Sequence, residues 1–508
     1  MKKTHFLAQA AKLGGLTIVS SALGFARELL IAGRFGASHT TDSYLVALSV
    51  PSLIYALFFG SGLNVSLVPR LSVLMKEDPD CGRTMFARFL SGAALCGLLF
   101  SACVLAFPGF FVRIFAPGLA YSPVASAAVR ALSPLVFLFV VSYGLASFHC
   151  ASNQVAHWGL IPAIQNITLV IVLVVVGARF GLNGLLAGTV AGALIAFFVQ
   201  ACTARSDGFR ERWADPFKPG PGRSMLFGMG AFALVGGLGG DCGTGYADLF
   251  LIRFFASHQA PGSITLLALG NKLMGLPVLL VGAALGLALL PSLSVSVAAS
   301  DHARTSKLLT QALSCALLLV LPIAIVYCDL GAPIVHTLFR KTALLPGQLT
   351  ELGWILRAYS VAVVGTVVMM ILNAYLAALR RTKTLIAAGV LVLVANVGLM
   401  LLLTPRLGSA GIAMAISGGS VFYCLVLLVA LAPHLDRQLR WTLFKRAGVL
   451  GAGALAMHLL LMVTVRLPAV QSAGTITAIV IPLLAGTAAY VGWLGLHRKA
   501  LVLGLRGL

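Results

Sequence analysis

A few charged residues interrupt long apolar runs of this sequence, and the clearest are Arg27 and Glu28 within the run 23–30. A charge inside a membrane-spanning segment is costly, so such residues usually face a cavity or a partner. Because neighbouring helix residues point about 100° apart, we expect Arg27 and Glu28 not to pair directly with each other. The run predicts that Arg27 lines a cavity and contacts an anionic ligand. The alternatives are an ion pair with another helix, or a side chain that extends to the membrane surface.

Four further polar residues stand at the start of apolar runs or inside them. Asp42 begins the second run, where it either serves a ligand site, caps the free N–H groups of a helix, or does both. Asn271 and Lys272 interrupt the run 264–297, and we expect Lys272 to contact a phosphate, with extension to the membrane surface as the alternative. Arg357 is nearer a helix end, so extension to the surface is expected there, and ligand contact is the alternative.

Three aspartates within apolar segments, Asp241, Asp248 and Asp329, are candidates for coupling transport to an ion. Asp248 is five residues from Arg253, so a local pair between those two is an alternative. The nine Cys residues include no C-x-x-C pair, and the His residues form no H-E-x-x-H motif. We therefore expect no metal and no cofactor. No carboxylate pair or nucleophile motif is present either, so the sequence does not predict an enzyme.

Composition indicates which elements hold these charges. Of the 508 residues, 59% are hydrophobic and 10% are charged, and the mean hydropathy is +0.99. A soluble chain has about 25% charged residues, and a membrane-spanning helix needs about 20 apolar residues. The sequence predicts an all-α, multi-pass membrane protein with about fourteen transmembrane helices. The expected helices are 10–34, 43–74, 85–112, 126–151, 157–178, 184–204, 224–252, 264–297, 306–330, 350–379, 384–404, 409–433, 447–467 and 474–496.

Positive charge is concentrated in every second loop. The net charge of +22 would fit a nucleic-acid-binding protein, but the alternation is the positive-inside pattern of membrane proteins. It predicts an inner-membrane protein with both termini in the cytoplasm, and membrane lipids rather than nucleic acid as partners. The opposite loops are expected to hold mostly single Arg residues, among them Arg34 and Arg253. The expected cytoplasmic residues are Lys2, Lys3, Lys12, Lys76, Arg83, Arg88, Arg205, Arg210, Arg212, Lys218, Arg223, Arg304, Lys307, Arg380, Arg381, Lys383, Arg437, Arg440, Lys445, Arg446, Arg498, Lys499 and Arg506.

A polar stretch rich in Pro and Gly at 205–223 divides the chain into two sides that resemble each other. Four short segments recur at a spacing of about 219 to 227 residues, which predicts two six-helix repeats of the same orientation. Many transporters are built from repeats, with the substrate site between the halves. The matched segments are 34–39 with 253–258, 45–48 with 266–269, 67–73 with 289–295, and 179–184 with 406–411. The expected domains are a first lobe at 1–204, a cytoplasmic linker at 205–223, a second lobe at 224–433, and two appended helices with a basic tail at 434–508.

Several of these motifs together resemble the MurJ/MviN family of lipid II flippases, within the multidrug/oligosaccharidyl-lipid/polysaccharide (MOP) exporter superfamily. The resemblance covers nearly the whole chain, and it is carried by the motifs at 24–28, 35–37, 41–44, 68–69, 260–294 and 358–360. It implies a flippase that moves an undecaprenyl-diphosphate-linked glycan to the outer leaflet by alternating access. It also implies that Arg27 and Lys272 are basic cavity residues and that Asp42 lies near the outer gate. The last two helices resemble those that form a groove for the lipid tail.

The chain departs from the family at Ser21, Tyr55, Ala56 and Gly275, where charged residues are usual. Lipid II is the expected cargo, and an exopolysaccharide or O-antigen repeat unit on the same kind of lipid is the alternative. There are two more distant alternatives. One is a drug or cation antiporter of the same superfamily, and the other is a membrane scaffold that transports nothing. The resemblance implies that membrane potential or an ion gradient drives the protein. We expect a monomer, with cell-wall synthesis proteins as candidate partners.

Overall fold

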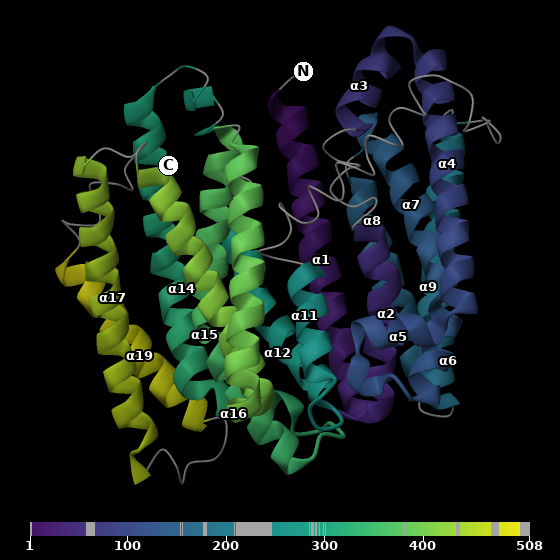
Figure 1. Ribbon diagram of the computed structural model, residues 1–508. Helices are drawn as coiled ribbons and strands as arrows, with labels where there is room; N and C mark the ends of the chain where they lie inside the picture. The colour runs from purple at the N-terminus through teal and green to yellow at the C-terminus, as the bar shows by residue number, and fades with distance from the viewer. Residues whose placement is uncertain are drawn as a thin grey trace. The chain divides into compact units, whose positions relative to one another are not determined.

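A computed structural model gives the fold, and every regular element among its described residues is a helix (Figure 1). It describes residues 3–56, 67–152, 154, 156–175, 180–207, 209, 246–283, 285, 289, 292–293, 295–297, 299, 301–379, 381–432, 437–468 and 477–497. The helices are α1 (Lys3–Phe35), α2 (His39–Tyr55), α3 (Val68–Glu77), α4 (Pro79–Ala106), α5 (Pro108–Phe115), η3 (Pro117–Leu119), α6 (Pro123–Leu132), α7 (Pro134–Ala151), α8 (Ala156–Val175), α9 (Gly181–Ser206), α11 (Tyr246–Ala256), α12 (Ser263–Pro277), η5 (Val278–Ala283), α14 (His302–Phe339), α15 (Pro346–Ala378), α16 (Thr382–Leu431), α17 (Arg437–Val465) and α19 (Thr477–Leu496).

Within the described part of the chain, ten helical segments are long and apolar enough to cross a membrane. The predicted all-α, multi-pass architecture is therefore confirmed, while the number fourteen stays a prediction. The expected helix at 224–252 lies mostly outside the described residues.

Proline explains where several predicted helices divide. The helix expected at 85–112 separates into α4 and α5 at Pro108, and the one expected at 126–151 separates into α6 and α7 at Pro134. Proline has no backbone N–H to donate to the preceding turn, so it begins a helix more readily than it continues one. In contrast, α14 continues to Phe339, beyond the predicted end at 330.

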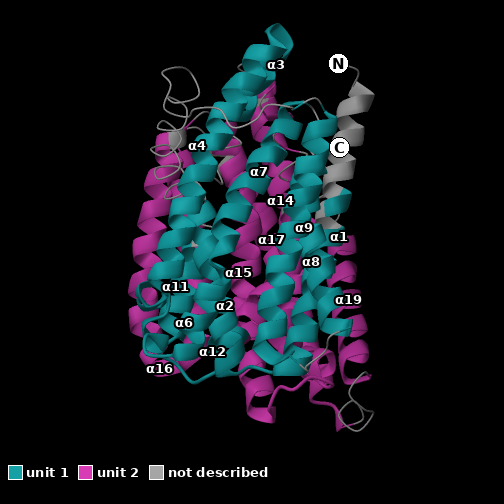
Figure 2. Cartoon of the chain, turned by 90° about the vertical axis from the view of Figure 1, so that its right-hand side faces the viewer, with its two compact units in different colours: residues 1–265 teal, residues 266–508 magenta. Residues whose placement is uncertain are grey.

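The chain forms two compact units, residues 1–265 and 266–508 (Figure 2). The boundary falls inside α12, so the first turn of this helix belongs to the first unit. The domain boundaries predicted from the repeat, at 204, 223 and 433, rest on sequence similarity and stay predictions.

Two glycines at matched positions of the sequence repeat share an unusual backbone. Gly181 has a φ of 51° and Gly408 has a φ of 57°, a left-handed conformation that favours glycine. Gly181 begins α9, and Gly408 is the non-helical residue that separates the two straight parts of α16. The helices predicted at 384–404 and 409–433 are these two parts. The shared geometry supports the repeat inferred from the sequence.

In the first unit, α8 packs against α1 and α9, and α7 packs against α4 and α9. Ala146, Ile161 and Ala196 form a small buried cluster where α7, α8 and α9 meet. In the second unit, α15 packs against both α14 and α16, with buried Val363, Val367 and Leu372 on α15. These packed helices fix the positions of the polar residues described next.

The two last helices pack on α14 within the second unit. Their contact contains buried Leu330, Met457, Leu461 and Tyr490, and the Tyr490 hydroxyl donates to the carbonyl oxygen of Leu318 at 3.0 Å. The appended pair is therefore attached to the second unit by both apolar and polar contacts.

Candidate functional site

Arg27 and Glu28 form a direct ion pair on α1, with 2.5 Å between Arg27 Nη2 and Glu28 Oε1. The expectation that these neighbours do not pair is wrong. The 100° rule describes the Cβ directions, whereas the flexible Arg side chain is long enough to bring its guanidinium back to the adjacent carboxylate. Both side chains are largely buried, with exposed fractions of 17% and 7%. Pairing lowers the cost of keeping both charges away from water.

A second helix holds the other side of the Arg27 guanidinium. Arg27 Nη1 donates to Asn166 Oδ1 of α8 at 2.9 Å, and Asn166 Nδ2 donates to the carbonyl oxygen of Ser20 at 3.0 Å. Gly24 leaves room for this amide, because a Cβ at that position would lie 3.3 Å from Asn166 Nδ2. The guanidinium is thus fixed in orientation by α1 and α8. Sequence reasoning missed Asn166, whose only signal was a polar amide within the apolar run 157–178.

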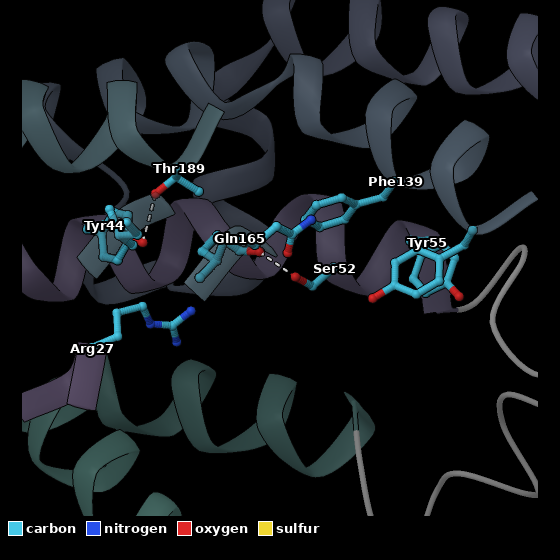
Figure 3. A pocket seen from close by; sticks show the side chains of 10 residues that line it. Arg27, Tyr44, Ser52, Tyr55, Phe139, Gln165 and Thr189 are labelled. Atoms are coloured by element: carbon cyan, nitrogen blue, oxygen red, sulfur yellow. Dashed lines mark hydrogen bonds between the residues drawn. The ribbon is translucent and has the colours of Figure 1, made fainter. Parts of the chain in front are cut away.

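Arg27 lines a cavity of about 170 Å³ within the first unit. Figure 3 shows its guanidinium directed into this space, opposite Tyr44 of α2 and Thr189 of α9. Tyr44 Oη and Thr189 Oγ1 are 3.0 Å apart, and because Thr189 donates to the Leu185 carbonyl oxygen, Tyr44 is the donor. The prediction that Arg27 faces a cavity agrees with this geometry, and its contact with an anionic ligand stays a prediction. The lining residues are Arg27, Tyr44, Leu48, Ser52, Tyr55, Phe139, Tyr143, Gln165, Leu169 and Thr189.

One wall of the cavity is aromatic. The rings of Tyr55 and Tyr143 are stacked with their centroids 4.4 Å apart, and Phe139 contacts each of them edge-on. Tyr55 is one of the positions where the resemblance predicts a charged residue. The departure therefore replaces a charge with an aromatic surface on this side of the cavity.

Asp42 lies in the first turn of α2, and its carboxylate accepts hydrogen bonds from the segment 262–265 of the same unit. Its Oδ2 accepts from the Gly262 N–H at 2.6 Å, and its Oδ1 accepts from Thr265 N–H at 2.9 Å and Thr265 Oγ1 at 2.6 Å. The helix-capping role offered for Asp42 is wrong, because Ser38 caps α2 and forms a capping box with Thr41. Asp42 instead joins two segments that are distant in the sequence.

Arg253 is a buried cation that sequence reasoning assigned to an outer loop. It lies in α11, and only 6% of the residue is exposed. Helix α11 packs against α2, which carries Tyr44, and the charge of Glu28 acts on the Arg253 guanidinium. Arg253 is not one of the residues that line the cavity. The apolar residues on both sides of it in the run 249–256 were the signal that this segment is helical and buried.

The remaining candidates of the second unit occupy different surroundings. Lys272 is exposed on α12, and Asn271 beside it is half-buried. Arg357 is exposed on α15, and its guanidinium lies 5.4 Å from the centre of the Trp354 ring. This placement fits a side chain at a helix surface.

Of the three aspartates that are candidates for coupling transport to an ion, the two that the structure describes are not among the residues that line the cavity. Asp329 of α14 is buried and pairs with His458 of α17, with 2.7 Å between Oδ2 and Nδ1. Sequence reasoning did not identify His458 as its partner. Asp248 is half-buried in the first turn of α11, and Asp241 lies outside the described residues.

Comparison with known proteins gives one consistent family. The family model described as lipid II flippase MurJ matches residues 31–481. The probable lipid II flippase MurJ of Rhizobium meliloti (strain 1021) is 26% identical over 418 residues, which cover 80% of this chain and 76% of the relative. The lipid II flippase MurJ of Burkholderia cenocepacia is 25% identical over 431 residues, or 82% of each chain.

Solved structures share the fold. A lipid II flippase MurJ in an inward closed conformation matches with a TM-score of 0.80 and 20% identity, covering 96% of this chain and 98% of the other. An inward-facing multidrug resistance MATE family transporter of the MOP superfamily matches with a TM-score of 0.66 and 15% identity, covering 84% and 95%. Since the family model covers most of the sequence and the fold agrees with it, this multi-pass membrane chain belongs to the lipid II flippase MurJ family.

Proposed function

We propose that this protein moves lipid II from the inner to the outer leaflet of the bacterial inner membrane by alternating access. The observation that carries the proposal is Arg27, an oriented guanidinium that faces a cavity inside a membrane-spanning bundle. Membership of the lipid II flippase MurJ family gives the substrate class.

The chemistry of the cavity fits a diphosphate group. A guanidinium is a planar fork that binds phosphate oxygens through two parallel hydrogen bonds, and it stays charged at any physiological pH. The neighbouring tyrosine and threonine hydroxyls at Tyr44 and Thr189 add polar groups without adding charge. In the MATE-type alternative, a cationic drug would be repelled by Arg27, so the geometry favours an anionic substrate.

The size of the cavity supports a transport cycle with distinct states. About 170 Å³ accommodates several water molecules or a small anionic group, but not a lipid-linked disaccharide. The headgroup therefore requires a wider conformation for entry, and substrate binding would shift the population toward it. On the basis of its matched position in the family, Lys272 is assigned a supporting contact to the same substrate.

Orientation, coupling and partners follow from the same proposal. The alternation of basic loops supports cytoplasmic positions for both termini. Asp248 and Asp329 remain candidates for coupling to an ion, because intramembrane acids serve this role in transporters. We propose a monomer surrounded by membrane lipids, which receives its cargo from cell-wall synthesis proteins.

Depletion of the protein in the bacterium that carries it tests the function. We expect lysis and accumulation of lipid II in the inner leaflet, measured by the accessibility of the lipid to an externally added peptidoglycan hydrolase or label. Normal growth with loss of a surface polysaccharide would reject lipid II and select the alternative lipid-linked glycan.

A further inference from the structure

We propose that Arg253 is a second cation of the Arg27 site and binds the same anionic headgroup. This inference rests on the proposed function, because it extends the binding site of that substrate. It assigns a substrate contact to a residue that the alternation of basic loops placed outside the membrane.

The fold brings Arg253 to this site from a distant part of the sequence. Helix α11 packs against α2 and α5 within the first unit, and the rings of Phe250 and Phe115 meet edge-on with their centroids 5.4 Å apart. This contact anchors α11 beside the helix that contributes Tyr44 to the cavity. The backbone of Arg253 is thus held by packed apolar residues, so its side chain is positioned before any ligand arrives.

The guanidinium of Arg253 is buried but not satisfied. Its Nη1 is inaccessible to solvent and has no hydrogen-bond partner in the described part of the chain. A buried donor without a partner loses its hydration without compensation. Such a group in a native protein indicates a missing partner. Because α11 packs against α2, which carries the cavity residue Tyr44, we take that partner to be an oxygen of the substrate headgroup.

The charge balance around Arg253 calls for an anion. Among the described acidic residues, Glu28 is the one whose charge acts on Arg253, and it is already bonded to Arg27. Arg27, Arg253 and Glu28 together carry two positive charges and one negative charge, so one positive charge of these three groups has no counter-charge among them. An uncompensated buried charge is strongly unfavourable. A phosphate or diphosphate group would restore the balance and would supply acceptors for the unused N–H group.

Arg34 provides an internal comparison, since it occupies the matched position of the sequence repeat. Its Nη1 donates to the carbonyl oxygen of Leu173, near the end of α8. Arg34 thus has a backbone carbonyl oxygen as its acceptor. The Nη1 of Arg253, at the equivalent position, has no acceptor among the described residues. The difference points to a ligand role for Arg253.

Binding measurements on the full chain in lipid nanodiscs test this inference, with undecaprenyl diphosphate as the probe and undecaprenyl monophosphate as the comparison. The variants are Arg253→Gln and Arg253→Met, with Arg34→Gln as the matched control for loss of one charge. We expect both Arg253 variants to bind the diphosphate roughly ten- to hundredfold more weakly, the range of a charge-assisted hydrogen bond. The affinity of the Arg253 variants for the monophosphate should fall by a smaller factor. Arg34→Gln should bind the diphosphate as the wild type does.

Thermal unfolding without ligand separates binding from folding. Methionine has a similar length and no charge, so Arg253→Met should keep or raise the unfolding temperature if the arginine is held ready for a ligand. Unfolding of both variants would assign Arg253 a structural role and overturn the inference.

Two further outcomes distinguish this inference from the proposed function. If Arg27→Gln loses diphosphate binding while both Arg253 variants retain it, Arg253 is not in the site and the proposed function stands. If the wild type does not bind the diphosphate, the proposed function fails, and the role of Arg253 fails with it.

Discussion

The first unit contains two buried charged clusters that contrast in how completely they are bonded. The Asp42 carboxylate accepts three hydrogen bonds from Gly262 and Thr265, on both of its oxygens. The Arg27 guanidinium pairs with Glu28 and Asn166, yet it faces a cavity, and its Nε finds no hydrogen-bond partner among the described residues. Asp42 is saturated by its own chain, whereas Arg27 keeps capacity for another group.

This contrast shows that an intramembrane charge is not by itself a binding residue. Arg27 lies within an apolar run and Asp42 begins one, and the resemblance matches both to charged positions of the family. Their difference lies in the acceptors and donors that the tertiary structure brings to them. We therefore expect a substitution at Arg27 to weaken substrate binding even where stability is restored, and a substitution of Asp42 to lower stability without weakening substrate binding in the folded protein.

The largest effect is expected for Arg27→Gln. Diphosphate binding should weaken roughly ten- to hundredfold, and cells should lose complementation. Removal of the guanidinium also breaks the buried ion pair between Arg27 and Glu28, which costs about 3–5 kcal/mol of stability. The double variant Arg27→Gln/Glu28→Gln should recover most of that stability but not transport. Recovery of transport by the double variant would show that Arg27 only neutralises Glu28.

The next effect is expected for Asp42→Ala. Three donors lose their acceptor, so the free energy of unfolding should fall by about 3 kcal/mol. Thermal unfolding in detergent measures this loss, and diphosphate binding at a temperature where the variant is folded should stay within threefold of the wild type. Weaker binding by tenfold or more in the folded variant would place Asp42 in the substrate site and remove the contrast.

A smaller effect of the same kind is expected for Gly262→Ala. Gly262 has a φ of 97°, and a Cβ there would lie 2.6 Å from the carbonyl oxygen of Ala37. The strain should lower stability by about 1–3 kcal/mol. The substitution also displaces the Gly262 N–H, which donates a hydrogen bond to Asp42. The double variant Gly262→Ala/Asp42→Ala should therefore lose less free energy of unfolding than the sum of the two single losses. Full additivity of the two would indicate that the hydrogen bond contributes little.

The smallest effect is expected for Arg357→Gln in the second unit. Its exposed contact with Trp354 is worth about 0.5–1 kcal/mol, and diphosphate binding should change by less than twofold. Measurement of both quantities tests whether Arg357 compensates for the family charges absent at Ser21, Tyr55 and Ala56. A tenfold loss of binding would assign it that role.

The sequence was sufficient to predict the helical membrane architecture and the family, while the two-lobe repeat stays a prediction. Each depends on local patterns, such as apolar runs, alternating basic loops and short motifs, that are readable along the chain. It also identified Arg27 and Asp42 as unusual. It did not predict the Arg27–Glu28 pair, because side-chain length and rotamer decide that contact rather than the angular spacing of residues on a helix.

The tertiary structure alone decided which polar residues come together. Asn166 meets Arg27, Thr265 meets Asp42, and His458 meets Asp329 across separations of more than a hundred residues. No local pattern encodes these distances, since they arise from how the helices pack. Charge pattern even suggested the wrong environment for Arg253, because a basic residue near a helix end looks the same in sequence whether it faces water or a buried cavity. Hydropathy thus determined the membrane architecture, and packing determined whether each buried charge is satisfied or left available to a substrate.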